Sequence, residues 1–361
     1  MTTKSIFIVF IFFSTFCYGQ KTLHYADSII KANQIPELSY AVVTNNSILE
    51  IAALGHHSVL LKDIATLNDR FHIGSNTKAM TAYMIAKYVE QGKLNWKKKF
   101  FDLFPEWKQQ SNPAYYNITL QDLLSHRALI QPFQGENDPT IPDFKGTKQE
   151  KRAAFGKFVL TLAPVKNDTI NKFTYSNADY TLATLMLEKI TKMSWEQLIN
   201  KVYNQDLKLN VKFSWPENQT RKDTWGHSFE NGKLIIPIPS NTDYHLDYTE
   251  PAGDINITLK DYAKFIQLNI RGLEGHNNYL KASTYNFIHQ GLVGYSLGWF
   301  NIYEDDKSFS THSGTAGTYY SLVTIDRKKH ISYIIFTNAF NEETINGVRL
   351  LMRKLKQNYG S

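Results

Sequence analysis

The chain has 361 residues, of which 42% are hydrophobic and 20% are charged, and its formal net charge is +7 at pH 7. This length and apolar content allow one large domain or two ordinary domains, each with a buried core. The basic residues are spread along the chain and the densest run, Lys97 to Lys99, is short. The charge is therefore typical of a solvated surface and argues against a nucleic-acid partner.

The first nineteen residues have the layout of a secretory signal. Lys4 precedes an apolar run from Ile6 to Phe13, and small and polar residues follow. The run is shorter than the roughly 20 residues that span a bilayer. We therefore predict a signal peptide at residues 1–19, a periplasmic or secreted protein, and no stable membrane span after cleavage. The alternatives are an uncleaved anchor and lipid attachment at Cys17, although the residue before this cysteine is larger than lipid-attachment motifs prefer.

Cysteine and histidine usage bears on metal binding. Cys17 is the only cysteine, so the chain without its signal has neither a disulfide nor a cysteine ligand. The eleven histidines show no H-E-x-x-H or other ligand spacing, and the pair His56-His57 is interpreted as a turn. We predict no metal site and no cofactor.

After the signal, the sequence predicts a helix, a β-hairpin and a second helix. Residues 25–35 read as a short helix, and the runs 39–43 and 48–53 read as strands joined by a tight turn. Apolar residues recur at helical spacing in 75–92, and Gly92 is a natural stop.

The middle of the chain, from about 95 to 285, is predicted to be mainly helical with long irregular links. Helices are expected at 118–126, 177–191, 194–203 and 257–272, with Thr119, Asn177, Ser194 and Thr258 as N-caps.

The C-terminal part changes character. Aromatic and β-branched runs at 295–303, 308–314, 319–327 and 330–338 predict an antiparallel meander, and 341–357 predicts an amphipathic helix. The expected fold class is α/β, with an antiparallel sheet flanked by helices and built from both chain ends. We predict a sheet domain from 20–94 and 286–361, and an inserted mainly helical domain from 95–285.

The segment "GYSLG" fits G-x-S-x-G, the pattern around the nucleophile of α/β-hydrolases. That motif needs a helix directly after the serine, but the residues after Ser296 alternate like a strand. We therefore expect Ser296 to lie in a strand bracketed by Gly294 and Gly298 and to have no catalytic role.

A better candidate nucleophile is Ser75, which forms the pattern S-x-x-K with Lys78. In the first turn of a helix, residues i and i+3 share one face, so the hydroxyl and the amine can meet. A serine needs a base beside it, and a lysine with a lowered pKa can be that base. The pattern recurs at Ser28 and Lys31, where we expect both side chains to face solvent.

Two further motifs follow in order. Tyr175 and Asn177 form Tyr-x-Asn before a helix, where a tyrosine oxygen can relay protons and an amide can bind a substrate carbonyl and orient Lys78. The same pattern at Tyr115 and Asn117 precedes a helix cap and needs no catalytic role.

The third motif is His312-Ser313-Gly314 at the end of a predicted strand. Gly314 would let a substrate lie close along the strand edge. The next amide, of Thr315, can pair with that of Ser75 as an oxyanion hole, in which each donor is typically worth about 2.7–4 kcal/mol.

These motifs, with "ITLQDLLSH", "PAGDINITLKDYAKFIQ" and "YSLGWF", make the chain resemble the penicillin-recognising serine hydrolases. The similar branch holds class C β-lactamases, DD-carboxypeptidases, D-aminopeptidases and related esterases, and the resemblance covers about residues 25–355. It implies a β-lactamase/transpeptidase-like fold. It also implies that Ser75 is acylated, that Lys78 and Tyr175 share the acid/base work, that Asn177 contacts substrate, and that the Ser75 and Thr315 amides hold the oxyanion.

The sequence departs from β-lactamases at His312, where they carry lysine. A neutral histidine attracts a substrate carboxylate less than lysine does, which favours an esterase or a peptidase. We predict an exported serine hydrolase that acts on an ester or amide in a small molecule or short peptide. The alternative is a non-catalytic penicillin-binding or sensor protein on the same fold. The sequence does not indicate the oligomeric state.

Overall fold

The computed structural model describes residues 22–135, 138–167, 172–216, 223–236, 246–304, 307–315 and 317–360. The predicted signal at 1–19 lies outside these residues. Within the described ranges, no helix has both the length and the apolar character needed to cross a membrane.

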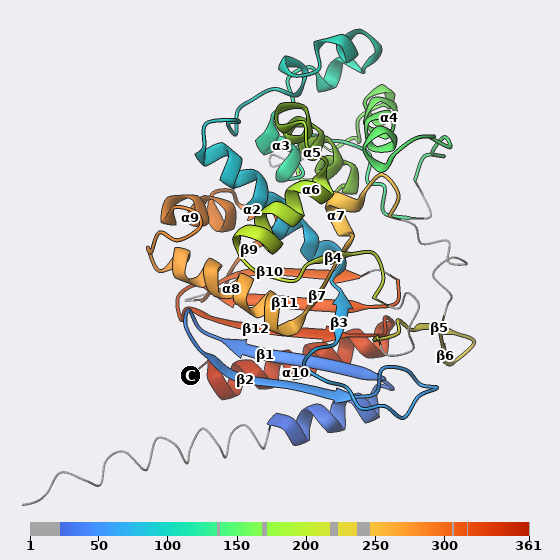
Figure 1. The fold of residues 1–361 in the computed structure, drawn as a ribbon, viewed down its shortest axis with the longest axis vertical. Helices are drawn as coiled ribbons and strands as arrows, with labels where there is room; N and C mark the ends of the chain where they lie inside the picture. The colour runs from blue at the N-terminus through green and yellow to red at the C-terminus, as the bar shows by residue number, and fades with distance from the viewer. Residues whose placement is uncertain are drawn as a thin grey trace, which may run out of the picture.

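A seven-stranded antiparallel sheet forms the base of the molecule (Figure 1). Its strands are β1 (Glu37–Val43), β2 (Ile48–Gly55), β8 (Gly294–Tyr295), β9 (Phe300–Glu304), β10 (Lys307–Thr315), β11 (Tyr320–Asp326) and β12 (Ile331–Thr337). The order across the sheet is β2-β1-β12-β11-β10-β9-β8. The pairing of β1 with β12 joins the two chain ends, which confirms the predicted fold class. The two domain boundaries stay a prediction.

The remaining elements lie between β2 and β8 or at the chain ends. The short strands are β3 (Arg70–His72), β4 (Lys212–Phe213), β5 (Ser228–Glu230), β6 (Lys233–Ile235) and β7 (Ile255–Thr258). The helices are 22–32, α2 (Thr77–Glu90), α3 (Leu120–Leu124), α4 (Lys148–Thr161), α5 (Asn177–Thr191), α6 (Trp195–Ile199), α7 (Glu250–Gly253), α8 (Leu259–Leu273), α9 (Ala282–Gln290) and α10 (Glu342–Tyr359). Shorter turns are η1 (Gly74–Asn76), η2 (Phe100–Asp102), η3 (Pro105–Gln110), η4 (Pro113–Tyr115) and the π-turn η5 (Asn200–Asp206).

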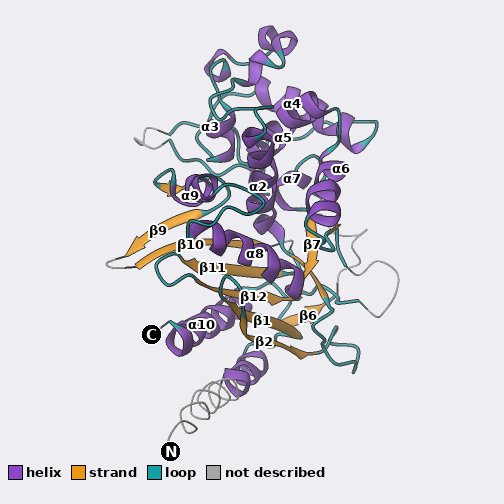
Figure 2. Ribbon diagram, turned by 60° about the vertical axis from the view of Figure 1, so that its left-hand side comes forward, coloured by secondary structure: helices purple, strands orange, loops and turns teal. Residues whose placement is uncertain are grey.

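Helices cover both faces of the sheet (Figure 2). Helix α8 packs on β1 and β12 from one side, and α10 packs on β11 and β12 from the other. Along β1, Leu38, Tyr40 and Val42 join the core beneath α10, whereas Ala41 and Val43 join the larger core on the α8 side. A strand that is buried on both faces reads as a continuous apolar run, which explains why β1 and β12 lack polar alternation.

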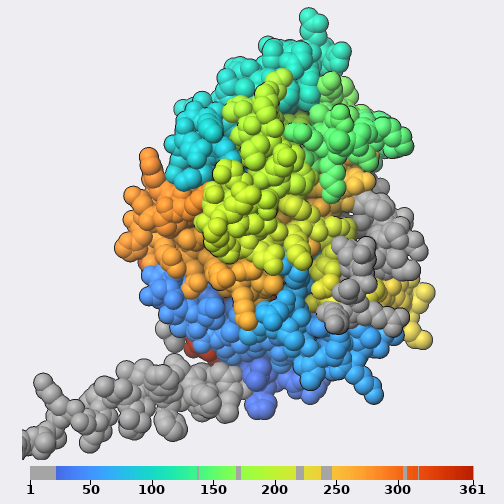
Figure 3. Space-filling view, viewed as in Figure 1, coloured from blue at the N-terminus to red at the C-terminus, as the bar shows by residue number. Residues whose placement is uncertain are grey.

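The middle of the chain is stacked above the sheet, as the cyan to yellow-green segments of Figure 3 show. Helix α2 runs from the sheet into this layer and contacts α5 and α7. Ser75 lies at the sheet end of α2, where the helical layer and the sheet meet.

Three of the four predicted N-caps are confirmed. The side chains of Thr119, Ser194 and Thr258 each accept a hydrogen bond from the amide three residues on. The prediction for Asn177 is wrong, because Ser176 is the N-cap residue and Asn177 is the first helical residue. The side chain of Asn177 therefore does not cap the helix and lies at the candidate site instead.

The middle of the chain also contains strands that the sequence analysis missed. Residues 255–258 form β7, which pairs with β3 and β4, so the helix predicted at 257–272 begins only at Leu259. These strands have two to four residues, too few for an alternating pattern to stand out. Helices α4 and α9 were also not predicted.

The strand predicted at 295–303 is two strands, β8 and β9, that pair with each other. Gly294 and Gly298 have φ values of 76° and 84°, so the chain turns between them instead of continuing as a strand. A Cβ at Gly298 would lie 2.7 Å from the Cα of Ala79. The glycine therefore lets this turn pack directly against the start of α2.

Candidate active site

Ser75 lies in the 3₁₀ turn η1, between β3 and α2, and Lys78 lies in the first turn of α2. The Lys78 Nζ is 3.1 Å from the Ser75 Oγ. Ser75 is partly exposed, whereas Lys78 is fully buried. The two residues of the predicted motif therefore meet, with the hydroxyl within reach of solvent and the amine shielded from it.

Burial determines the protonation of Lys78. Its Nζ donates to the Asn177 Oδ1 at 2.7 Å and to the Ala252 carbonyl at 3.0 Å. Desolvation lowers the pKa of Lys78 well below its ordinary value of 10.5, and the charge of Asp179 opposes this shift without cancelling it. The surroundings therefore favour the neutral amine, which is the form that can accept a proton from a serine hydroxyl.

Asn177 holds Lys78 in place. Its side-chain amide donates to the Phe133 carbonyl at 2.8 Å while its oxygen accepts from Lys78. Its backbone amide donates to the Pro132 carbonyl at 2.8 Å. These bonds fix which end of the side-chain amide faces the lysine; the substrate contact predicted for Asn177 stays a prediction.

Tyr175 lies beside Lys78, with the amine 4.6 Å from the centre of the phenol ring. The ring of His126 packs against Tyr175 at a centroid distance of 4.4 Å. The Nδ1 of His126 is 2.9 Å from the Asp179 Oδ2, and both side chains are fully buried. The tyrosine is therefore supported from behind by a buried histidine–carboxyl pair.

This supporting pair was missed by the sequence analysis. His126 ends the segment "ITLQDLLSH", so the resemblance pointed at its neighbourhood without giving it a role. Asp179 in the first turn of α5 looks like an ordinary helix-start acid, which the helix dipole favours. Burial raises the pKa of Asp179 and lowers that of His126, so both side chains are favoured in their neutral forms.

The end of β10 lies against the turn that carries Ser75. A Cβ at Gly314 would lie 2.0 Å from the Ile73 carbonyl oxygen and 2.6 Å from the Ser75 nitrogen. A Cβ at Gly74 would lie 2.3 Å from the Thr315 nitrogen. The two glycines thus permit a backbone-to-backbone approach that brings the amides of Ser75 and Thr315 to the same place.

Ser321, on β11, stabilises the contact between β10 and the turn that carries Ser75. Its hydroxyl donates to the Ile73 carbonyl at 2.8 Å and accepts from the Asn76 side chain at 2.7 Å. The turn that carries Ser75 is therefore bonded to the sheet on both sides of this residue. Sequence reasoning missed this contact, because Ser321 is one of many serines and belongs to no motif.

His312 does not face outward as a charged group. It is 2% exposed, and its Nε2 lies 3.2 Å from the Tyr295 hydroxyl. Burial and the charge of Lys78 lower the pKa of His312 to about 3, so the ring is neutral at pH 7. On the same strand, the neighbouring Ser313 is exposed.

The rival serines occupy ordinary structural positions. Ser296 is buried and donates to the Phe287 carbonyl at 2.8 Å, and no helix follows it. Ser28 is exposed and donates to the Tyr25 carbonyl, while Lys31 pairs with Asp27 in the same helix.

An antiparallel sheet covered by helices, with a Ser-x-x-Lys pair between the sheet and the helical layer, defines a β-lactamase/transpeptidase-like protein. The family model described as Beta-lactamase matches residues 24–354, so the chain belongs to that family. This membership confirms the family resemblance given by the motifs.

Known proteins resemble this chain at low sequence identity. Protein flp of Staphylococcus aureus (strain N315) is 22% identical over 320 residues, which are 87% of this chain and 61% of flp. The chain thus spans about three fifths of the length of this relative. The crystal structure of SurE has a TM-score of 0.75 at 18% identity and covers 95% of this chain and 76% of SurE. D-amino acid amidase from Ochrobactrum anthropi SV3 has a TM-score of 0.72 at 17% identity and covers 94% of this chain and all of that one.

Proposed function

We propose that the chain is an exported serine hydrolase that forms a covalent acyl-enzyme on Ser75 and cleaves an ester or amide. The observation that carries the proposal is the 3.1 Å contact between the Ser75 hydroxyl and the fully buried amine of Lys78. The leader-like pattern at residues 1–19 supports export.

The proposed reaction begins when the Ser75 Oγ attacks the substrate carbonyl carbon and its proton passes to the Lys78 Nζ. The oxygen of the tetrahedral intermediate accepts hydrogen bonds from the amides of Ser75 and Thr315. Collapse of the intermediate breaks the ester or amide bond, and the leaving group takes a proton delivered by Lys78 and Tyr175. Water then attacks the carbonyl carbon of the acyl-serine while the same groups remove its proton. The bond to the Ser75 Oγ breaks, the serine oxygen takes that proton, and the free acid departs.

The substrate class follows from the charges near Ser75. Because His312 is buried and neutral, it supplies no positive charge for a substrate carboxylate beside the scissile bond. We therefore infer a preference for substrates whose acyl part is uncharged there, such as short esters or amides. Asn177 and Ser313 are the proposed polar contacts for the substrate, and Gly314 lets it run along the end of β10.

The test is covalent labelling of wild type and of Ser75→Ala with a fluorophosphonate, followed by a hydrolysis panel. The panel contains nitrocefin, a D-Ala-D-Ala peptide, a D-amino acid amide and a short p-nitrophenyl ester. The name of the amidase that shares this fold motivates the third substrate. We expect labelling of wild type only, and the fastest turnover with the ester or the amide.

Two results would contradict the proposal. Equal labelling of wild type and Ser75→Ala would remove Ser75 as the nucleophile. Stoichiometric labelling by a penicillin without turnover of any substrate would instead identify the non-catalytic binding protein.

A further inference from the structure

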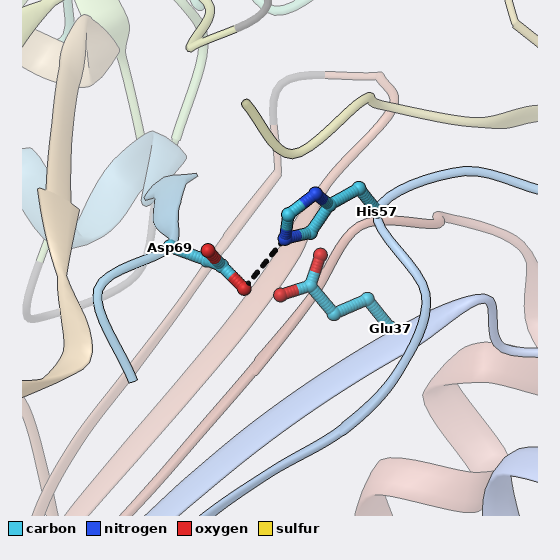
Figure 4. Close-up of side chains that lie close together, drawn as sticks. All are labelled: Glu37, His57 and Asp69. Carbon is cyan, nitrogen blue, oxygen red and sulfur yellow. Dashed lines mark ion pairs between the residues drawn. The ribbon is translucent and has the colours of Figure 1, made fainter. Parts of the chain in front are cut away.

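Three buried or nearly buried polar side chains, from three separate segments that precede Ser75, converge in the fold (Figure 4). Glu37 is the first residue of β1, His57 follows β2, and Asp69 immediately precedes β3. One ligand atom from each lies within 4.8 Å of the other two. The His57 Nε2 is 2.9 Å from the Asp69 Oδ2.

Glu37 has no cationic partner that explains its burial. Its side chain is 0% exposed and points into the cluster, and neither carboxylate oxygen has a partner at full hydrogen-bond geometry among the described residues, although the Thr224 hydroxyl and the Asp69 carboxyl lie nearby. Within the same residues, neither Glu37 nor Asp69 forms an ion pair with a lysine or an arginine. A buried carboxylate without a counter-charge is costly, by several kcal/mol in effective terms.

The orientation of His57 is set by a fourth residue. Its Nδ1 lies 2.8 Å from the carboxylate of Asp63, which is 40% exposed. With the proton on Nδ1, facing Asp63, the lone pair of Nε2 faces Glu37 and Asp69; with a proton on Nε2 as well, the ring donates to Asp69 at 2.9 Å. Asp69 also accepts from the amide and the hydroxyl of Thr66, whereas Glu37 relies on the cluster itself. The contact of Nδ1 with Asp63 is the arrangement of metal-binding histidines, whose second nitrogen is held by a carboxylate.

We propose that Glu37, His57 and Asp69 bind one divalent transition-metal ion, with Zn²⁺ as the best match. An imidazole nitrogen combined with carboxylate oxygens suits zinc, which binds both ligand types at about 2.0–2.2 Å. The charges also balance, because two carboxylates and a neutral imidazole neutralise a divalent cation.

The ion would fasten three separate segments of the chain. The ligands stand 20 and 12 residues apart in the sequence, so one ion closes two loops that would otherwise be open in the unfolded chain. One of the closed segments leads directly through β3 to the turn that carries Ser75. We infer a structural metal in a chain whose only cysteine lies in its predicted signal.

The sequence prediction of no metal site rested on ligand spacing. Positions 37, 57 and 69 form no motif, and His57 stands in a pair that was interpreted as a turn. Only the fold brings these residues together.

The test uses the purified protein after removal of metal with EDTA, in wild type and in the Ser75→Ala background. Zinc is added back and measured by isothermal titration and by elemental analysis of the dialysed protein, with the melting temperature recorded in parallel. Cobalt(II) serves as a spectroscopic probe, because its visible absorption reports nitrogen and oxygen ligation. We expect one zinc per chain in both backgrounds and a melting temperature that rises with zinc concentration.

Three variants locate the ion. Glu37→Gln keeps the side-chain volume and removes a ligand charge, so it should weaken zinc binding at least 100-fold. Asp63→Asn should weaken it about 10–100-fold through the orientation of His57. Glu343→Gln, the same chemical change at an exposed position of α10, should leave zinc binding unchanged.

The opposite outcomes are equally clear. Absence of zinc binding, with Glu37→Gln as stable as wild type or more so, would overturn the proposal. It would mean that bound protons, and not a metal ion, neutralise the three side chains. Zinc bound equally well by Glu37→Gln would place the ion elsewhere and also overturn it. If Glu37→Gln does not fold, Asp63→Asn decides, because Asp63 is partly exposed and its loss leaves all three ligands in place.

Discussion

Gly314 gives a sharp test of the proposed oxyanion hole. In the substitution Gly314→Ala, the new methyl group would lie 2.0 Å from the Ile73 carbonyl oxygen and 2.6 Å from the Ser75 nitrogen. Ordinary contact begins at 3.4 Å, so β10 and the Ser75 turn must separate by about 1.4 Å. Both neighbours are backbone atoms, so no flexible side chain can absorb the clash.

A displacement of this size is large compared with catalytic tolerance. A misplacement of about 1 Å can cost about 10²-fold in rate, and the loss of one oxyanion donor costs about 10²–10³-fold. We therefore expect fluorophosphonate labelling of Ser75 in Gly314→Ala to slow at least 100-fold. The assay is the second-order rate constant of labelling, with circular dichroism and the melting temperature as measures of folding.

Gly92→Ala is the matched control. Gly92 follows the far end of α2, has a φ of 71°, and would place its Cβ in open space. This variant should lose about 1–2 kcal/mol of stability through left-handed strain and label at the wild-type rate. If folded Gly314→Ala labels within threefold of wild type, the contact between β10 and the Ser75 turn does not build the oxyanion hole.

Three further predictions concern other residues. Ser296→Ala should keep wild-type labelling and lose about 1 kcal/mol of stability with its bond to the Phe287 carbonyl, and a large loss of labelling in folded protein would reinstate Ser296 as a nucleophile. The labelling rate of Ser75 should rise with pH and level off well below pH 10.5, because burial lowers the pKa of Lys78; a rate that still climbs at pH 10.5 would contradict this. Burial raises the folded-state pKa of Glu250 from 4.5 to about 7, so the folded state binds more protons between these values and stability should fall as pH rises through them. Denaturant titrations from pH 4 to pH 8 should show a loss of up to about 3 kcal/mol in wild type and a flatter profile in Glu250→Gln, and equal slopes would refute the assignment.

The elements that were predicted correctly are those whose signal is local. The caps at Thr119 and Ser194 depend on residues three positions apart, and in both the later side chain also bonds back to the amide of the cap residue. Asn177 failed as a cap for a physical reason. Its side-chain oxygen accepts a hydrogen bond from Lys78, a buried lysine that lies 99 residues away in the sequence.

The candidate site could be predicted only where it follows ordered motifs. Ser75 and Lys78 are three residues apart, so helix geometry alone predicts their contact. Asp179 and Ser321 support the same site through long-range contacts, and nothing in their local sequence distinguishes them. The sequence places Gly314 at the end of a predicted strand. The need for a glycine there comes from backbone atoms of residues 73 and 75, which a Cβ would meet.

The polar contacts of α7 show how the helical layer and the site depend on each other. Glu250, the first residue of this four-residue helix, lies 3.4 Å from the guanidinium of Arg152, which is itself buried. Two residues later, the carbonyl of Ala252 accepts from Lys78. Burial raises the pKa of Glu250 and lowers that of Lys78, so both groups near α7 are favoured in their neutral forms. The low pKa of Lys78 that the proposed chemistry requires is consistent with the fold, because burial also raises the pKa of Asp179, the acid whose charge opposes the shift of Lys78.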